Sequence, residues 1–521
     1  MLQTREGLLS NFSLSCTSLP DLLKLGGLSM ARVVLLGLDG LCPEFLRQWA
    51  DELPNLMKMQ KRGIWGVLES AIPPALPQVW ISTQSGRNPG AYGIWDFTYR
   101  DDFSYGEKKV VSSEVTRRVD LLYTILPKKM QRVAMINVPA TWPSPKIPAG
   151  YVISGLITPN LDLSFTYPEN LKDEVYELVG KYIIDLTEAD VGGKEVDKGR
   201  VLQKIYEMDS QRFVLTKYFI NEKNCDCVMT AVMGCTRMLS LFYGGFNSQN
   251  RQYTPDPHYE GALHDYYLWI DKNIGELYQN VPKETVLFIY SGYSAKELQG
   301  RINLDEWLMK EGYMSLFEQP QRPTSFKDVK VDWSRTKCWS TGYTGKLYLN
   351  MKGREPQGIV DPKDYDKFLG ELTAKLKDIP DKGGKPLNTQ VWQPGDICFG
   401  PYVSYGPDLL VDFDEGRLGT SELVGHDQER IYSFDTAKDC HDVAYGLCGY
   451  FVITGPGIPE GKELKGVSLL NIAPTVLDVL DIPTPRNMER PSILPMVKKE
   501  VMPSPEETDK KVASRLKFLG Y

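Results

Sequence analysis

The chain has 521 residues, of which 42% are hydrophobic and 24% charged, and its formal net charge is -7. This length allows one large domain or two lobes, and the mild acidity gives no electrostatic reason to expect a nucleic-acid partner or an anionic membrane surface. No apolar run approaches the roughly 18 residues that span a bilayer, so we expect no membrane segment. The nine scattered cysteines predict reduced thiols in a cytoplasmic protein.

Residues 1–29 lack the basic start and apolar block of a secretory signal. Met30 directly precedes the first predicted strand. We therefore interpret residues 1–29 as a loosely held N-terminal extension, or as an artefact of the assigned start.

The rest of the chain is organised around the apolar run at residues 33–38, which is typical of a parallel strand covered on both faces. The run ends at Asp39-Gly40, and Pro43 then opens a segment with helical spacing of apolar residues. Asp39 is therefore expected at the carboxyl end of a strand, where open α/β sheets bind their ligands.

Strands and helices alternate along the chain, which predicts the α/β class with a mostly parallel sheet. Further strands are predicted at residues 131–138, 227–234, 286–290, 408–412 and 450–454, and helices at residues 201–220, 258–278 and 365–377. The charged segment 100–108 is interpreted as a surface insertion.

Composition divides the chain into a core and a smaller lobe. Residues 320–401 are polar and rich in proline and glycine, so we expect an inserted lobe there, between core segments 30–319 and 402–497. Residues 498–521 carry a capping box, Ser504-Pro505-Glu506-Glu507, and are expected to form a C-terminal docking helix.

Several motifs carry a resemblance to a known family. They are VVLLGLDG (33–40), IPP (72–74), GRNPG (86–90), GIWDF (93–97), INVPATWP (136–143), MKGREPQGIV (351–360) and SLLNIAPTVLDVLDIP (468–483). With them the chain, from about residue 31 to residue 521, resembles the type I phosphodiesterase and nucleotide pyrophosphatase group of the alkaline phosphatase superfamily. The resemblance implies an alkaline-phosphatase-like core with helices flanking the sheet, plus the smaller inserted lobe.

Active members of that family hold two divalent metals, commonly zinc, between Asp and His ligands, and attack phosphorus with a Thr or Ser nucleophile. The resemblance places the first metal ligand at Asp39, which keeps the family's residue type. It places the nucleophile at Leu76, an Asp and a His at Thr236 and Ser240, a second such pair at Gly292 and Tyr293, and the last His at Tyr445. The resemblance thus implies a degenerate pocket without catalytic residues and without a metal site.

The residue types support this interpretation. Leucine has no nucleophilic atom, and Thr236 and Ser240 are poor zinc ligands. Tyr293 and Tyr445 would fill space that metals and phosphate occupy elsewhere, and Asp39 is expected to accept backbone N–H bonds at the adjoining turn. We therefore predict a pseudoenzyme that acts as a binding or assembly subunit. A protein partner or larger complex is favoured over a small anionic ligand, because lost cations no longer attract phosphate.

The alternative is an active phosphohydrolase whose site is rebuilt or is completed by a partner. A relocated nucleophile could come from Ser82, Thr83 or Ser85, although no His or carboxylate nearby would activate it. A new metal site would require the strand-end cysteines, Cys42, Cys235 and Cys448, to converge on Asp39 together with Cys440-His441-Asp442.

Overall fold

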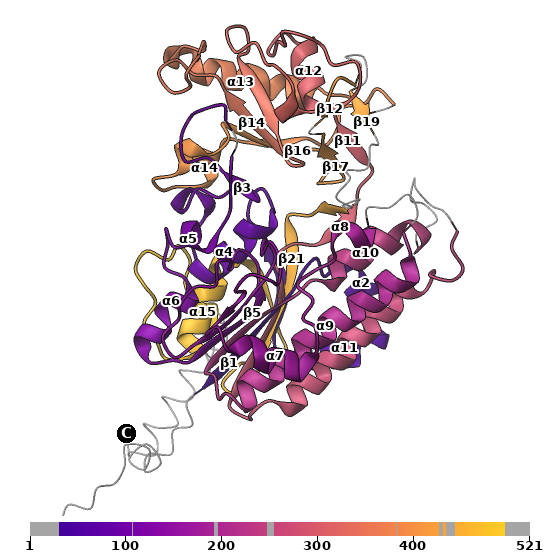
Figure 1. Ribbon diagram of the computed structural model, residues 1–521, viewed down its shortest axis with the longest axis vertical. Helices are drawn as coiled ribbons and strands as arrows, with labels where there is room; N and C mark the ends of the chain where they lie inside the picture. The colour runs from indigo at the N-terminus through magenta and orange to yellow at the C-terminus, as the bar shows by residue number, and fades with distance from the viewer. Residues whose placement is uncertain are drawn as a thin grey trace, which may run out of the picture.

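The computed structural model describes residues 31–106, 108–191, 196–246, 255–381, 383–421, 423–426, 431–433 and 443–494. This part of the chain forms a nine-stranded mixed sheet that is flanked by helices, and a smaller lobe lies at one end of it (Figure 1). The predicted α/β class with a mostly parallel sheet is confirmed.

The sheet is built outward from the central strand β1 (Arg32–Leu38), which pairs in parallel with β8 and β9. From edge to edge its order is β22 (Lys462–Ser468), β2 (Gly63–Glu69), β21 (Cys448–Thr454), β9 (Thr285–Ser291), β1, β8 (Cys227–Val232), β5 (Val133–Val138), β6 (Tyr151–Ser154) and β7 (Thr166–Tyr167). Strand β21 runs antiparallel to β9 and to β2. The carboxyl ends of β1, β8 and β9 therefore meet at one edge of the sheet.

Strand β1 is apolar throughout because both of its faces are covered. Val33 and Leu35 belong to one hydrophobic cluster, and Val34, Leu36 and Leu38 belong to another on the opposite face. Helices of the first cluster are α4 (Leu76–Ser85), α5 (Ser113–Thr116), α6 (Leu122–Ile125) and α15 (Ile472–Val479). Helices of the second are α2 (Pro43–Gln48), α3 (Pro54–Lys61), α7 (Leu171–Val179), α9 (Lys198–Asn221), α10 (Gly234–Phe246) and α11 (Ala262–Asn280).

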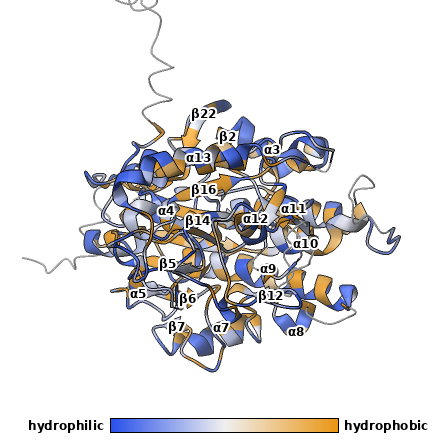
Figure 2. Cartoon of the chain, turned by 90° about the horizontal axis from the view of Figure 1, so that it is seen from above, coloured by the Kyte–Doolittle hydropathy of each residue, from blue (hydrophilic) through white to orange (hydrophobic). Residues whose placement is uncertain are grey.

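The smaller lobe has a hydrophobic cluster of its own. Its described elements include an antiparallel sheet in the order β13 (Cys338–Thr341), β14 (Gly345–Leu349), β16 (Leu409–Asp412) and β15 (Gln390–Trp392), with α12 (Leu304–Lys310) and α13 (Tyr365–Lys377). Hydrophilic and hydrophobic residues alternate along α13 when the molecule is seen from above (Figure 2). The expected return to the core at residues 408–412 is wrong, because β16 pairs with β14 and β15 inside this lobe.

Shorter elements complete the lobe and join it to the core. They are β3 (Thr98–Tyr99), β4 (Lys109–Val110), β10 (Ala295–Glu297), β11 (Gly300–Ile302), β12 (Thr324–Ser325), α14 (Pro394–Ile397), β17 (Leu418–Thr420), β18 (Leu423–Val424), β19 (Tyr432–Ser433) and β20 (Val443–Tyr445). The short helix α8 (Glu188–Val191) belongs to the core, where Asp190 pairs with Lys204 of α9. Strands β10 and β20 pair antiparallel, with Ala295 opposite Tyr445 and Glu297 opposite Val443.

Of the described residues in segment 100–108, Asp101, Asp102, Ser104 and Gly106 are exposed, as expected of a surface insertion, whereas Arg100 departs from that expectation. The Arg100 side chain is buried and pairs with the buried Glu355 of the lobe at 3.2 Å, and Lys108 donates to Thr341 Oγ1 at 2.7 Å. Arg100 and Lys108 therefore tie this segment to the lobe, while Asp101 and Asp102 face solvent.

The N-terminal extension, residues 1–29, and the expected docking helix at residues 498–521 lie outside the described residues. Within the described ranges, no helix combines the length and the apolar character needed to cross a membrane.

Candidate functional site

Asp39 stands at the carboxyl end of β1, as its sequence context predicted. Its backbone carbonyl accepts hydrogen bonds from the Thr236 N–H at 3.1 Å and from Thr236 Oγ1 at 2.9 Å, which ties β1 to the start of α10. Gly40 follows with φ at 75°, and a Cβ there would lie 2.2 Å from Thr236 Oγ1. Only glycine fits this close approach without displacing the helix.

Both carboxylate oxygens of Asp39 accept hydrogen bonds from side-chain hydroxyls. Tyr293 donates to Oδ1 at 2.5 Å, and the Thr236 hydroxyl shares its one proton between Oδ2 and the Asp39 carbonyl, each at 2.9 Å. The expectation that Asp39 would accept backbone N–H bonds at the adjoining turn is wrong, because hydroxyls from α10 and from the segment after β9 satisfy it. Asp39 therefore serves as an acceptor that joins three segments of the chain.

The surroundings of Asp39 are almost dry. Asp39 is 4% exposed and Tyr293 is 1% exposed. Burial raises the pKa of Asp39 to about 6, although the Tyr293 hydrogen bond, the Arg237 charge and the Thr236 hydrogen bond all act to lower it. Burial, together with the adjacent Asp39, raises the pKa of Tyr293 well above its ordinary value, so this phenol keeps its proton and remains a donor.

The positive charge that lowers the pKa of Asp39, that of Arg237, is already paired. Arg237 lies beside Thr236 on α10, and its guanidinium binds both carboxylate oxygens of Asp185. Both side chains of this pair are buried. A bidentate pair of this kind satisfies the cation, so Arg237 acts on Asp39 only through its field.

The other positions that the family resemblance singled out, Leu76, Ser240, Gly292 and Tyr445, are described residues that form no hydrogen bond with the Asp39 carboxylate, and each has packing or hydrogen-bond partners of its own. The Tyr445 ring lies edge-on to the Tyr293 ring with centroids 4.8 Å apart. Leu76 is the buried first residue of α4, and Ser240 donates to the Arg237 carbonyl of its own helix at 3.0 Å. A Cβ on Gly292 would lie 2.2 Å from Val79 Cγ1, so at this position the backbone packs directly against α4.

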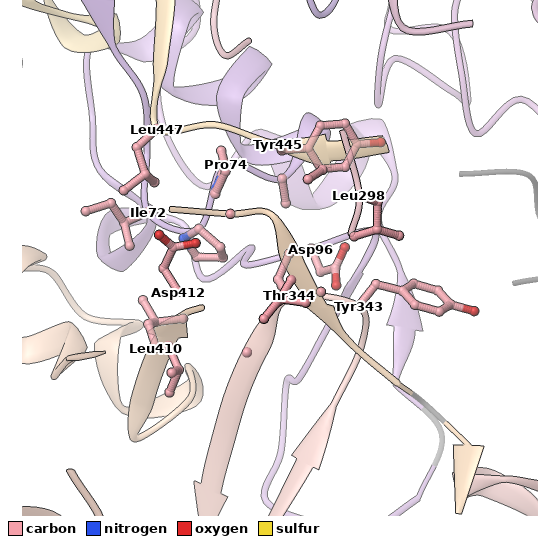
Figure 3. A pocket seen from close by; sticks show the side chains of 18 of the residues that line it. Ile72, Pro74, Asp96, Leu298, Tyr343, Thr344, Leu410, Asp412, Tyr445 and Leu447 are labelled. Carbon is pink, nitrogen blue, oxygen red and sulfur yellow. The ribbon is translucent and has the colours of Figure 1, made fainter. Parts of the chain in front are cut away.

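A cavity of about 140 Å³ lies between the core and the lobe and is bordered by Leu76 and Tyr445 (Figure 3). Tyr293 lies against Asp39, and Tyr445, whose ring contacts that of Tyr293, borders the cavity. Its other walls come from the segment before α4, from β20, from Leu298 just after β10, and from the lobe's β16. The strand-end region of the core thus ends in a largely apolar chamber.

The rebuilt metal site that was considered as an alternative has no support within the described residues. In those parts of the chain, no group of three or more His, Cys, Asp or Glu side chains is placed to hold a metal ion. Cys42 donates to Glu44 at 2.9 Å, and burial raises its pKa to about 12, which opposes the thiolate form that zinc requires. Cys440, His441 and Asp442 lie outside the described residues.

The residues considered as a relocated nucleophile are buried within α4. Ser82 shares a hydrogen bond with the Tyr92 hydroxyl at 2.7 Å, while Thr83 and Ser85 each donate to a carbonyl one turn earlier. These hydroxyls complete the packing of the helix, and none of the three residues lines the cavity.

Sequence reasoning missed the Arg237–Asp185 pair and two acidic residues of the cavity, Asp96 and Asp412. Asp96 lies inside the GIWDF motif, and Arg237 directly follows Thr236, so both stood in segments already singled out. The available signal was a charged residue inside an otherwise apolar motif, which indicates a buried partner.

Comparisons with known proteins give one family match. The type I phosphodiesterase / nucleotide pyrophosphatase family profile matches residues 33–417. No curated protein matches the chain.

Solved structures similar to the chain include human ectonucleotide pyrophosphatase / phosphodiesterase 5, with 14% identity over 88% of this chain and 97% of that chain, and a TM-score of 0.46. The murine protein of the same name, as an inactive variant in complex with AMP, is 12% identical to the chain. The match covers 88% of this chain and 97% of that chain, with a TM-score of 0.47. Phosphonoacetate hydrolase from Sinorhizobium meliloti 1021, in complex with phosphonoformate, is 13% identical to the chain. The match covers 87% of this chain and 95% of that chain, with a TM-score of 0.49.

Proposed function

Because the chain belongs to the type I phosphodiesterase / nucleotide pyrophosphatase family, we propose that it is a catalytically inactive member whose role is to bind a ligand or to serve in an assembly. The observation that carries this proposal is the state of Asp39, whose two carboxylate oxygens both accept hydrogen bonds from hydroxyl donors. A pair of divalent cations needs lone pairs directed at it from several side chains. Around Asp39, Tyr293 and Thr236 direct protons at the carboxylate instead.

The donor set does not fit a two-metal centre. Leu76, Gly292 and Tyr445 supply neither a carboxylate nor an imidazole, and the hydroxyl of Ser240 is engaged with its own helix. Arg237, the cation whose charge acts on Asp39, is paired with Asp185. These residues therefore give no basis for a metal-dependent reaction step.

The size of the barrier supports the same conclusion. Phosphate ester hydrolysis needs its barrier lowered by on the order of 20 kcal/mol, and positioning supplies roughly 7 to 11 kcal/mol of that amount. The remainder comes from a nucleophile and from charge stabilisation. With Leu76 at the start of α4 and hydroxyl donors on Asp39, the described residues offer neither.

The test is hydrolysis of bis(p-nitrophenyl) phosphate by protein purified without chelator, with zinc, manganese or magnesium added, alongside metal analysis of the same sample. Wild type, Asp39→Asn and Leu76→Ala should all remain at the uncatalysed rate, and the metal content should lie well below one ion per chain. Near-stoichiometric zinc or manganese, with cleavage that exceeds both variants, would refute the proposal.

A partner-completed site is tested with the same substrate. The tagged chain is recovered with its natural complex, and the intact complex is assayed beside a complex assembled with Asp39→Asn. Equal rates support a binding or assembly role. A rate that depends on Asp39 would show that a partner supplies the missing catalytic groups.

A further inference from the structure

The cavity beside Leu76 and Tyr445 has apolar walls. Its apolar lining residues include Ile72, Pro74, Leu298, Leu410 and Leu447, which surround the space from both the core and the lobe (Figure 3). A dry apolar cavity of about 150 Å³ accepts a benzene ring, and this one measures about 140 Å³. The space therefore suits one small ring or a short branched chain.

Two carboxylates stand among these apolar walls, and their partners differ. Asp96 forms an ion pair with Lys346; burial acts to raise the pKa of Asp96, but the charge and hydrogen bond of Lys346, with the Phe97 N–H and the Lys108 charge, together hold it below its usual value. Asp412 Oδ2 is buried from solvent, and among the described residues no group donates a hydrogen bond to it. An ionised oxygen buried without a donor is costly, which makes it a point where a ligand's donor would be favoured.

The cations near Asp412 have other contacts. Lys296 acts on Asp412 through its field, while its Nζ donates to the Glu415 carbonyl at 3.3 Å. Arg301 also lines the cavity, where its guanidinium lies over the Tyr343 ring and donates to the Thr420 carbonyl at 3.3 Å. Burial raises the pKa of Asp412 to about 6, so at pH 7.5 this carboxyl is mostly ionised.

We propose that this cavity binds a small, mainly apolar molecule that carries an amine, with the ammonium group donating to Asp412 and the apolar part against Leu76, Leu410 and Leu447. The inference rests on the proposed function, because it assigns a ligand class to a cavity that a reacting phosphodiester would otherwise enter. Apolar contact supplies the attraction, and one buried polar group fixes orientation, as in most small-molecule sites. At the position proposed for the ammonium group, a phosphate or carboxylate would face the Asp412 carboxylate and is disfavoured there.

The experiment compares three probes that share one ring: benzylamine, benzyl alcohol and benzoate. Calorimetric titration at pH 7.5 should give measurable binding of benzylamine, weaker binding of benzyl alcohol and none of benzoate. Asp412→Asn should weaken benzylamine by about tenfold to a hundredfold, since a hydrogen bond to a charged group is lost, and should leave benzyl alcohol within about twofold.

The matched control is Glu415→Gln, which removes an exposed carboxylate near Asp412 that does not line the cavity. Its benzylamine affinity should stay within about twofold of wild type. Leu447→Trp fills the cavity and should abolish binding of the amine and of the alcohol.

Three results would overturn the inference: no benzylamine binding, equal benzylamine affinity in wild type and Asp412→Asn, or benzoate binding as tight as benzylamine binding. Each of these can occur in a protein that does not hydrolyse phosphodiesters, and so refutes the ligand class alone. Metal-dependent hydrolysis in the assay described above refutes the proposed function instead.

Discussion

Replacing Asp39 with asparagine tests whether this carboxylate is a structural acceptor or a metal ligand. The change keeps the size and shape of the side chain and removes its charge. Asp39 is 4% exposed, so its ionised form has lost nearly all of its contact with water. We expect Asp39→Asn to be more stable than wild type at pH 7.5, because the penalty for burying the charge disappears.

The expected gain follows from the pKa of Asp39. Raising a carboxyl pKa from 3.8 to about 6 disfavours the ionised folded form by about 3 kcal/mol, since a tenfold change in an equilibrium corresponds to about 1.4 kcal/mol. The amide introduced by Asp39→Asn keeps one acceptor for Tyr293 and presents a donor to the Thr236 hydroxyl, which must rotate to accept it. We therefore expect the free energy of unfolding to rise by about 1 to 3 kcal/mol at pH 7.5.

The gain should depend on pH in a defined direction. The unfolded chain releases the Asp39 proton near its ordinary pKa of 3.8, whereas the folded chain holds it to about 6. Wild type therefore loses stability as the pH rises through this interval, and the loss is complete above it. The advantage of Asp39→Asn should grow over the same interval and nearly vanish at pH 4.

Urea denaturation followed by tryptophan fluorescence, at several pH values between 4 and 7.5, measures this difference. Asp162→Asn changes an exposed aspartate and serves as the control, with an effect within about 0.5 kcal/mol at every pH. A loss of stability in Asp39→Asn at pH 7.5, or a difference that does not change with pH, would refute the reasoning. A metal ligand would behave in the opposite way, because its replacement removes the stabilisation that bound metal provides.

Three further changes probe the same region. Tyr293→Phe removes the donor to Asp39 Oδ1 and should lower the free energy of unfolding by about 1 to 3 kcal/mol at pH 7.5. The loss should be smaller at pH 4, where Asp39 is protonated. Equal losses at both pH values would contradict this expectation. Arg237→Met leaves the Asp185 carboxylate buried without its partner and should cost about 3 to 5 kcal/mol in urea denaturation. Adding Asp185→Asn to that variant should restore part of the lost free energy of unfolding. If none is restored, the Arg237–Asp185 pair is not the source of the loss. Leu76→Thr places a hydroxyl at the start of α4 and should leave bis(p-nitrophenyl) phosphate hydrolysis in zinc at the rate of Leu76→Ala; a clear increase would mean that the metal machinery persists.

Local pattern predicted the elements of the fold but not all of their partners. The apolar run of β1 and the helix at residues 365–377 follow from burial and periodicity, which neighbouring residues determine. Strand β16 has the same apolar pattern as a core strand, so the sequence of Leu409–Asp412 does not predict which sheet the strand joins. Arg100 looked exposed because its partner, Glu355, lies 255 positions away in the sequence.

In the candidate site, too, the sequence predicted which residues lie near one another but not how their side chains interact. Family motifs placed Thr236 and Tyr293 near Asp39, although they stand 197 and 254 positions from it in the chain. The motifs did not say that both hydroxyls donate to the carboxylate, because donor direction depends on side-chain rotamers in the folded protein. They also did not reveal that Asp412, from the lobe, borders the same cavity as Leu76.

Topology decides which positions meet in this protein, and residue identity decides what chemistry they support. The parallel pairing of β1 with β8 and β9 brings the segments after these strands together whatever side chains they carry, and the lobe adds β16 beside them. Where metal cations stand between these segments, the resulting cavity attracts phosphate. With hydroxyls on Asp39 and with Arg237 held by Asp185, the charge left facing the cavity includes Asp412, whose Oδ2 is buried without a donor among the described residues. The same arrangement of strands then favours a ligand of the opposite charge, and the order of affinity of benzylamine, benzyl alcohol and benzoate measures that reversal directly.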